Sequence, residues 1–362
     1  MSIRSTLAAA ALLILALTLA APAGAEPLAS GKTTLTLSDG FFRQLKKHGV
    51  EIVQLRPAKV RGRVITLPVR GGQLESKSGA GRVNHRGGIG FRAGKRLVTL
   101  RDFSLDTVKR SLSAKLGGRR LIFAAASGLS SNRDGLGVDV FAKDLRLSEG
   151  AAAILRRKLG LPGVFASGRS LAASITGTQP AAVTVSSGTV SLALDPGFEA
   201  KLQSLEVTTA PFESATLLSG SPTTYSFAVV HGSLAPDLSS GVLVTATGLR
   251  LTQGDGSSAP RLLLAPLSLA LDSRRVSSGF DARPSPPLAG PLGIAPLAAI
   301  GIAGGAVGVD SDGTVTMADT AATLEPYAAD PLNEAFAKAK GKAPLFAAGE
   351  PFGSFAFTLQ TG

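Results

Sequence analysis

The feature that most constrains the fold of this chain is a pattern that occurs twice. The first copy spans residues 31–50, GKTTLTLSDGFFRQLKKHGV, and the second spans residues 188–207, GTVSLALDPGFEAKLQSLEV. Each copy reads as a strand with alternating apolar residues, a turn with an aspartate (Asp39 or Asp195) that can cap a helix, and a short amphipathic helix. The period is too long for a solenoid repeat, so the pattern indicates a duplicated domain.

Further matches follow both openings at corresponding positions. They are Leu67, Val69, Gly72, Leu74, Gly81, Gly88, Ile89 and Phe91 in the first copy and Phe227, Val229, Gly232, Leu234, Gly241, Gly248, Leu249 and Leu251 in the second. Short alternating segments between glycine-rich turns predict an all-β fold with a few short helices, in two tandem β-sandwich-like domains. We expect the domains to span residues 31–178 and 188–362, with residues 179–187 as a linker.

The expected strands of both copies follow from the same alternation. They are residues 33–37, 64–69, 96–101, 111–116, 137–141 and 144–147 in the first copy, and 190–194, 224–230, 242–251, 262–271 and 314–317 in the second. One further helix is expected after Ser148, ended by Gly160. Its counterpart is expected to begin at Asp330-Pro331, with the aspartate as cap and the proline at the first position.

Residues 284–308 break the correspondence between the copies. The chain carries no charge from Pro286 to Val309, which is long enough to raise the question of a membrane span. Pro291, Pro296 and several glycines favour a loop, a short helix and a buried strand, and a membrane helix is the alternative.

The first 25 residues have the composition of a secretory signal. They carry one charge, Arg4, an apolar stretch and the small-residue site Ala23-Gly24-Ala25, which predicts cleavage before Glu26. An uncleaved anchor is the alternative. The expected location is extracellular, in association with the cell envelope, with no transmembrane helix after cleavage. The chain has no cysteine, which excludes disulfides, thiol chemistry and cysteine-based metal sites.

The net charge of +13 hides an asymmetry between the copies. Residues 26–180 contain 28 Lys and Arg against 10 Asp and Glu, whereas residues 181–362 contain 9 against 15. A basic first domain can meet an anionic polymer, a lipid or an acidic ligand, or it can lie against its own acidic partner. A solvated basic surface without a specific ligand is the other interpretation.

Catalytic motifs are not found in this sequence. His48, His85 and His231 are far apart and have no metal-ligand spacing, and there is no nucleophile elbow, phosphate loop or dinucleotide fingerprint. Asp312-Gly313 and Asp134-Gly135 read as hairpin turns rather than parts of a calcium loop. We therefore do not expect an enzyme.

Two sets of residues are candidates for ligand binding. Tyr225 and His231 are six residues apart on a predicted strand and are expected to project to the same side. A tyrosinate beside a histidine is one way to hold ferric haem, and a core tyrosine with a strand-end histidine is the alternative. The second set is His85 alone, in VNHRGG. The alternative interpretation of His85 is a turn or sheet-rim residue.

The pattern resembles the HtaA domain, a secreted or surface β-rich module found singly and in tandem in actinobacterial haem-uptake proteins. The resemblance rests on Leu67-Pro68-Val69, Gly71-Gly72-x-Leu74, Gly79-x-Gly81-x-Val83 and Gly88-Ile89-x-Phe91. It covers most of residues 31–177 and, more faintly, residues 188–362.

The resemblance implies haem as the ligand, held in that family by a tyrosine of the first helix and a histidine after the Gly-x-apolar-x-Phe strand. Here Leu45 or Leu202 falls at the tyrosine position, and Gly94 or Lys95 falls near the histidine position. Haem would therefore be held differently, by His85 or by Tyr225 with His231.

The sequence thus predicts a secreted, non-enzymatic binding protein of the cell envelope, with haem as its implied ligand. The competing prediction is a structural or adhesive module whose basic first domain binds an anionic envelope polymer. Nucleic acid is not an expected partner under either prediction.

Overall fold

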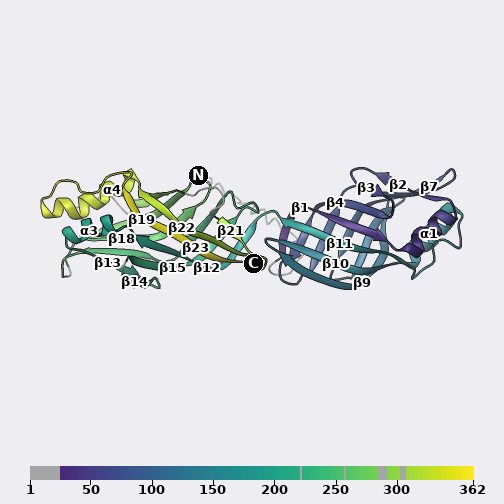
Figure 1. Cartoon of the computed structure of the whole chain (residues 1–362), viewed down its shortest axis with the longest axis horizontal. Helices are drawn as coiled ribbons and strands as arrows, with labels where there is room; N and C mark the ends of the chain where they lie inside the picture. The colour runs from purple at the N-terminus through teal and green to yellow at the C-terminus, as the bar shows by residue number, and fades with distance from the viewer. Residues whose placement is uncertain (1–24, 221, 257, 284–291, 302–306) are drawn as a thin grey trace, which may run out of the picture.

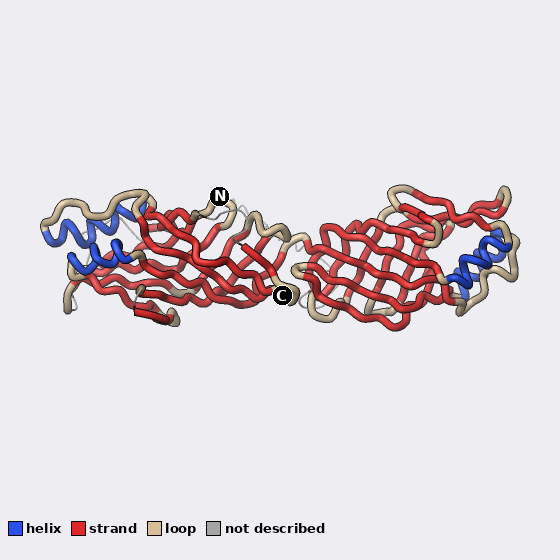
Figure 2. Tube along the Cα trace, viewed as in Figure 1, coloured by secondary structure: helices blue, strands red, loops and turns tan. Residues whose placement is uncertain are grey.

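The computed structural model describes residues 25–362 apart from 221, 257, 284–291 and 302–306. The predicted signal therefore lies, except for Ala25, outside the described residues. Two sheets follow one another along an elongated molecule, and the helices gather at its two far ends (Figures 1 and 2). Strands dominate both halves, which confirms the predicted fold class of two tandem all-β domains.

The first sheet is built from residues 25–180. Its strands are β1 (Ala25–Leu37), β2 (Val50–Leu55), β3 (Lys59–Arg61), β4 (Val64–Glu75), β5 (Gly81–His85), β6 (Gly88–Ala93), β7 (Arg96–Asp106), β8 (Ser111–Leu116), β9 (Arg119–Asp134), β10 (Gly137–Leu147) and β11 (Ser170–Pro180). The strand order is β2-β6-β7-β5-β4-β1-β11-β10-β9-β8, with β3 on β4, and a further pairing of β7 with β8 closes the sheet. The first and last strands, β1 and β11, are antiparallel neighbours.

The second sheet is built from residues 183–361. Its strands are β12 (Val183–Leu194), β13 (Val207–Phe212), β14 (Thr216–Gly220), β15 (Thr223–Leu234), β16 (Gly241–Thr245), β17 (Gly248–Gln253), β18 (Arg261–Ala270), β19 (Arg275–Arg283), β20 (Leu292–Ile300), β21 (Val307–Val309), β22 (Thr314–Leu324) and β23 (Pro351–Thr361). The order β13-β17-β18-β16-β15-β12-β23-β22-β20-β19 repeats the first sheet strand for strand, with β14 in the place of β3 and β21 added on β22. The duplication predicted from the sequence is therefore confirmed.

The two cores use aromatic residues at matching places. In the first, Phe41 packs edge-on against Phe91 and Phe165, with ring centroids 6.3 and 6.1 Å away. In the second, Phe198 lies 5.4 Å from Phe346. Each cluster joins the aromatic at the start of the first helix to the closing segment of its copy, as the matching sequence ends indicate. All of these rings are buried.

The first helices of the copies begin as predicted, with one correction. In α3 (Pro196–Ser204) the Asp195 carboxylate accepts from the backbone N–H groups of Gly197 and Phe198. In α1 (Asp39–Lys47) the cap is Ser38, whose hydroxyl accepts from the Phe41 N–H, so the prediction for Asp39 was wrong. Asp39 is instead the first helical residue, where its charge still suits the positive end of the helix dipole.

The later helices follow the same plan with a shifted start in the second copy. The structure confirms α2 (Glu149–Leu159) with Ser148 as cap and Gly160 in the left-handed conformation after its end. Its counterpart, α4 (Pro326–Leu332), begins five residues earlier than predicted, and Pro331 lies inside it. Pro326 and Pro331 both suit the first turn of a helix, and α4 begins at Pro326 because β22 ends just before it. A π-helix, η1 (Asn333–Ala337), and a short 3₁₀-helix, η2 (Lys338–Lys340), follow.

Two other predictions can be compared with the strands. The strand predicted at residues 242–251 is in fact two, β16 and β17, which both pair with β18 and have β15 and β13 as their other neighbours. Within residues 284–308, the described part contains β20, whose Leu297, Ala298 and Ile300 are buried, as expected for the predicted buried strand. The rest of the predicted loop and short helix lies largely outside the described residues. Among the helices that the structure describes, none has both the length and the apolarity to cross a bilayer.

The two aspartate-glycine turns are confirmed as hairpins. Gly135 joins β9 to β10 with φ 59°, and Gly313 joins β21 to β22 with φ 84°. These left-handed conformations explain why glycine follows the aspartate at both turns.

The repeated glycines at positions 88 and 248 allow close strand approach. A Cβ atom at Gly88 would overlap the carbonyl oxygen of Leu100 on β7, and one at Gly248 would overlap that of Leu264.

We predict that Gly88→Ala lowers the free energy of unfolding by about 3 kcal/mol in urea titration, because the β6–β7 ladder must separate. Gly40→Ala is the control, since its Cβ would meet nothing within 4 Å. Equal effects of the two substitutions would contradict this role.

Candidate anion-binding face and predicted ligand residues

His85 is the most buried of the three histidines and lies inside the first sheet. Its side chain is 1% exposed. Nδ1 lies 3.1 Å from the carbonyl oxygen of Phe103, which can only accept, so Nδ1 carries the proton. Nε2 therefore accepts from the Thr33 hydroxyl at 2.6 Å, and that hydroxyl oxygen lies 2.8 Å from the hydroxyl of Thr176. Both ring nitrogens are occupied, and an iron atom would have to displace Thr33.

Tyr225 lies in the core of the second sheet. Its side chain is buried, and its hydroxyl donates to the Thr209 hydroxyl at 2.7 Å. Burial raises the pKa of Tyr225 above its usual value, although the hydrogen bond with Thr209 opposes this. A raised pKa disfavours the tyrosinate form that binds ferric iron.

His231 lies on the same strand as Tyr225 but on the opposite face. The pairing of β15 with β16 shifts between Val229 and His231, so one extra residue is inserted and the strand alternation is reversed beyond it. His231 is consequently exposed. The expectation that Tyr225 and His231 share a side was wrong for this reason. The same shift occurs in the first sheet between Val69 and Gly71, so the bulge is part of the duplicated design.

The structure thus brings none of the three predicted ligand residues together. Nor do the described residues contain any group of three or more His, Cys, Asp or Glu side chains arranged to hold a metal ion. The role of His85, Tyr225 and His231 in binding a cofactor stays a prediction.

What the structure does bring together is a row of cations on the outer face of the first sheet. Arg101 of β7 is directly opposite Lys115 of β8, and Lys115 is directly opposite Arg120 of β9. Directly opposed residues of antiparallel strands project to the same face, and all three side chains are exposed. We call Arg101, Lys115 and Arg120 the cationic row.

One carboxylate lies within the cationic row. The Lys115 ammonium lies 2.9 Å from the Asp102 carboxylate, and this contact, with the nearby charges of Arg120 and Arg70, holds the pKa of Asp102 below its usual value. Asp102 therefore remains ionised, and it offsets one of the three positive charges.

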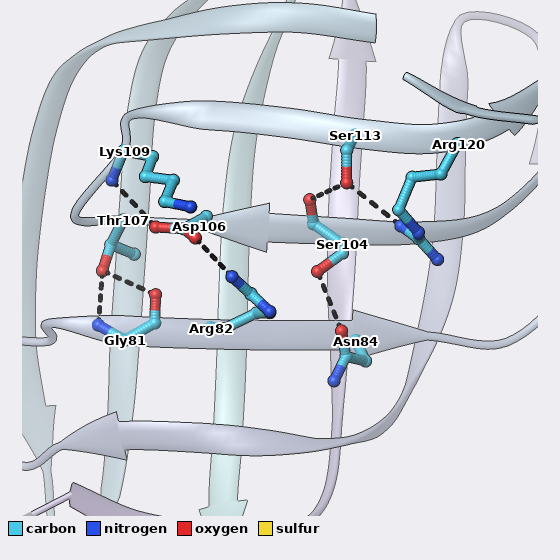
Figure 3. Close-up of polar contacts among 9 residues, drawn as sticks. All are labelled: Gly81, Arg82, Asn84, Ser104, Asp106, Thr107, Lys109, Ser113 and Arg120. Atoms are coloured by element: carbon cyan, nitrogen blue, oxygen red, sulfur yellow. Dashed lines mark hydrogen bonds and ion pairs between the residues drawn. The ribbon is translucent and has the colours of Figure 1, made fainter. Parts of the chain in front are cut away.

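A track of polar side chains continues the row across the same sheet (Figure 3). Arg120 donates to the Ser113 hydroxyl at 3.0 Å, and Ser104 donates to the side-chain oxygen of Asn84 at 2.8 Å. Further along, the Arg82 guanidinium and the backbone N–H of Lys109 both donate to the Asp106 carboxylate. Partial burial alone would raise the pKa of Asp106, but these two donors lower it.

The Asp106 contacts fix the side chain of Arg82 and the turn that joins β7 to β8. We call the cationic row together with Arg82 and Lys109 the cationic face. It presents guanidinium, ammonium and hydroxyl groups on adjacent strands and on the turn between β7 and β8, which is the chemistry that binds carboxylates, sulfates and phosphates.

Few cations of the first domain are neutralised by a carboxylate. Residues 25–180 are all described, and five of their 28 Lys and Arg side chains form ion pairs. The other Lys and Arg side chains of this range do not form ion pairs with a carboxylate. The asymmetry counted from the sequence is therefore a property of the folded surface.

The second copy shows that the fold does not require the cationic row. Leu100 is opposite Leu116 in the first sheet, and Leu264 is opposite Phe280 at the same place in the second. The next positions, Arg101 and Lys115, thus correspond to Ala265 and Gly279. In the second sheet the register of β18 and β19 shifts between Leu264 and Leu267, and the two strands pair on both sides of this shift without a charged pair.

The buried state of His85 predicts a pH-dependent stability. Burial lowers the pKa of His85 from 6.5 to about 4. Between these values the unfolded chain binds a proton that the folded chain does not, so stability falls as the pH drops through this window, by at most about 3 kcal/mol. The measurement is the free energy of unfolding at pH 7 and pH 4.5, for the natural chain and for His85→Gln.

The free energy of unfolding changes with pH in both chains, and the difference between these two changes separates the contribution of His85 from that of carboxylates, which titrate in the same pH range. In His85→Gln we expect a smaller fall in the free energy of unfolding between pH 7 and pH 4.5. An equal fall in both chains, or an NMR spectrum with a protonated His85 imidazole in the folded chain at pH 5.5, would contradict the assignment.

Comparison with known proteins returns solved structures only. No protein-family model matches the chain, and no curated protein matches it. The C-terminal domain of HtaA from Corynebacterium glutamicum is similar at 12% identity, over 42% of this chain and 98% of that one, with a TM-score of 0.34. The N-terminal domain of HtaA is similar at 10% identity, over 49% of this chain and 99% of that one, with a TM-score of 0.34.

The haem-binding protein HtaB from the same organism is similar at 13% identity. The similarity covers 50% of this chain and 95% of that chain, with a TM-score of 0.32. At this identity no functional residue is carried over to the chain.

Proposed function

We propose that the chain is a non-catalytic binding protein, exported by residues 1–25 to the cell envelope, whose first domain binds an anionic envelope polymer. The cationic face is the proposed binding surface, and residues 31–178 are the proposed binding domain. The observation that carries the proposal is the cationic row, in which Arg101, Lys115 and Arg120 are directly opposed on three adjacent strands.

Like charges placed directly opposite each other destabilise a sheet. The second domain builds the same strands with Ala265 and Gly279 at the first two of these positions, so the cost of the row is not imposed by the fold. A bound anion offsets that cost. This is the pattern expected where a surface is shaped by binding rather than by stability.

The arrangement suits an extended ligand with repeated charges. Adjacent strands are about 5 Å apart, so the three cations are spread over about 10 Å across the sheet. The arginine guanidinium groups at both ends can each donate a forked pair of hydrogen bonds to a carboxylate, sulfate or phosphate group. Because the row is exposed, its attraction is screened by salt.

We predict that Arg101→Gln, Lys115→Gln and Arg120→Gln together weaken binding of the full chain to polygalacturonate or heparin at least about tenfold at low salt. The physical reason is the loss of three adjacent charges from one surface. Calorimetric titration at several salt concentrations measures the effect, and the affinity of the natural chain should fall steeply with salt.

The matched control is Lys59→Gln, Lys77→Gln and Lys143→Gln, which removes the same net charge from three exposed, separated positions. Its affinity is expected to fall only about twofold, because only the general charge has changed. Equal losses in the two triple variants would show that net charge, rather than the row, determines binding. No binding by the natural chain would remove the proposal.

Haem is the second candidate ligand, and one observation favours it. His231 is exposed and, within the described residues, its ring has no hydrogen-bond or ion-pair partner. An imidazole without such a partner is available to coordinate ferric iron. Tyr225 lies on the other face and contributes nothing to such a site.

Titration of ferric haem into the full chain, followed in the visible spectrum, tests this candidate. A shift of the Soret band that is lost in His231→Ala and retained in His48→Ala is the expected result. An unchanged spectrum, or a shift that persists in His231→Ala, would contradict haem ligation by His231.

A further inference from the structure

We propose that the second domain carries a separate binding pocket for a neutral saccharide, formed by α4, η1, η2 and residues 342–344. The pocket is an open depression of about 610 Å³, a volume within the range typical of ligand sites. The side chains that define its chemistry are Tyr327, Asp330, Pro331, Ala337, Lys338 and Pro344. It lies in the second domain, away from the cationic face of the first (Figure 1).

The wall of the pocket is fixed by hydrogen bonds before any ligand arrives. Asn333 of η1 donates to the Phe346 carbonyl and accepts from the backbone N–H groups of Leu345 and Phe346, at 2.8 to 3.0 Å. Lys342 donates to the Ser204 carbonyl at 2.7 Å. Together these contacts tie the segment after η2 to the helix and to the rest of the domain. A pre-formed pocket loses little entropy when a ligand binds.

Tyr327 is the aromatic residue of this pocket. Its side chain is 69% exposed, whereas the other tyrosine of the chain, Tyr225, is buried in the core. Within the described residues its hydroxyl has no hydrogen-bond partner. An exposed ring with a free hydroxyl contributes nothing to the core, and such a ring is suited to stack on the apolar face of a ligand.

The first domain offers a comparison at the same place. Counted from the residue before each helix, Ser148 in α2 and Glu325 in α4, Tyr327 corresponds to Gly150. The space around Gly150 is open, with no atom within 4 Å of a Cβ placed there. Helix geometry therefore does not require an aromatic residue, and the pocket is a feature of the second domain.

The charges around the pocket favour a neutral ligand. Glu334 and Lys338 form an ion pair with each other, and Lys342 is engaged by a carbonyl group. The Asp330 carboxylate has no partner among the described residues. It would repel an anion, and it can accept hydrogen bonds from a neutral ligand.

A sugar ring matches the groups that remain. Its hydroxyls can donate to Asp330 and exchange hydrogen bonds with the Tyr327 hydroxyl. Its C–H face can pack on the tyrosine ring and on Pro331.

The experiment is calorimetric titration of the full chain with four neutral trisaccharides: maltotriose, cellotriose, mannotriose and N-acetylated chitotriose. At least one is expected to bind, with an affinity that falls at least tenfold in Tyr327→Ala and recovers to within a few-fold in Tyr327→Phe. Binding is also expected to be insensitive to salt. Because Tyr327 is exposed, Tyr327→Ala should keep the circular dichroism spectrum of the natural chain.

Leu218→Ala is the control, because Leu218 is also exposed and lies on β14 of the same domain. It should bind with unchanged affinity. No binding of any of the four trisaccharides, or equal binding by Tyr327→Ala, would overturn the proposal. Neither result affects the cationic face, since polymer binding there depends on other residues and on salt.

Discussion

The antiparallel pairing of the first strand with the last strand determines the rest of each domain. In the first sheet β1 lies between β4 and β11. In the second sheet β12 occupies the corresponding position between β15 and β23. This pairing joins the two ends of each copy, and the β7–β8 and β18–β19 pairings then close the sheets. The interior is filled by apolar side chains, and the outer faces of the strands are left free to differ. The two domains accordingly share a fold and diverge in their surfaces.

The divergence is concentrated at positions that the fold leaves unconstrained. Arg101 and Lys115 stand where the second copy has Ala265 and Gly279, and Tyr327 stands where the first copy has Gly150. In each case the other copy forms the corresponding strand or helix with a smaller residue. A basic surface on one domain and an aromatic pocket on the other are two independent additions to one scaffold. The proposed binding of an anionic polymer and the proposed binding of a neutral saccharide would each use one of these two positions.

Much of the fold could be predicted from the sequence, because the same pattern of strands, turns and helices occurs in both copies. The helix after Ser148 and the hairpins at Gly135 and Gly313 follow from local chemistry. The side of His231 could not be predicted, because a bulge adds one residue without any signal in the alternation. The cationic row could be predicted only in part. Its charge is plain in AKLGGRR, where a two-residue turn places Lys115 opposite Arg120, but Arg101 joins them only through the β7–β8 pairing, which is a tertiary contact.

Hydrogen–deuterium exchange of the full chain, with and without polygalacturonate, is the most direct measure of whether one of two like-folded domains has been specialised for anions. Binding at the cationic face predicts added protection in peptides from residues 99–123, and no change in the corresponding peptides from residues 262–283. Equal protection of both regions, or protection confined to the second domain, would contradict the account.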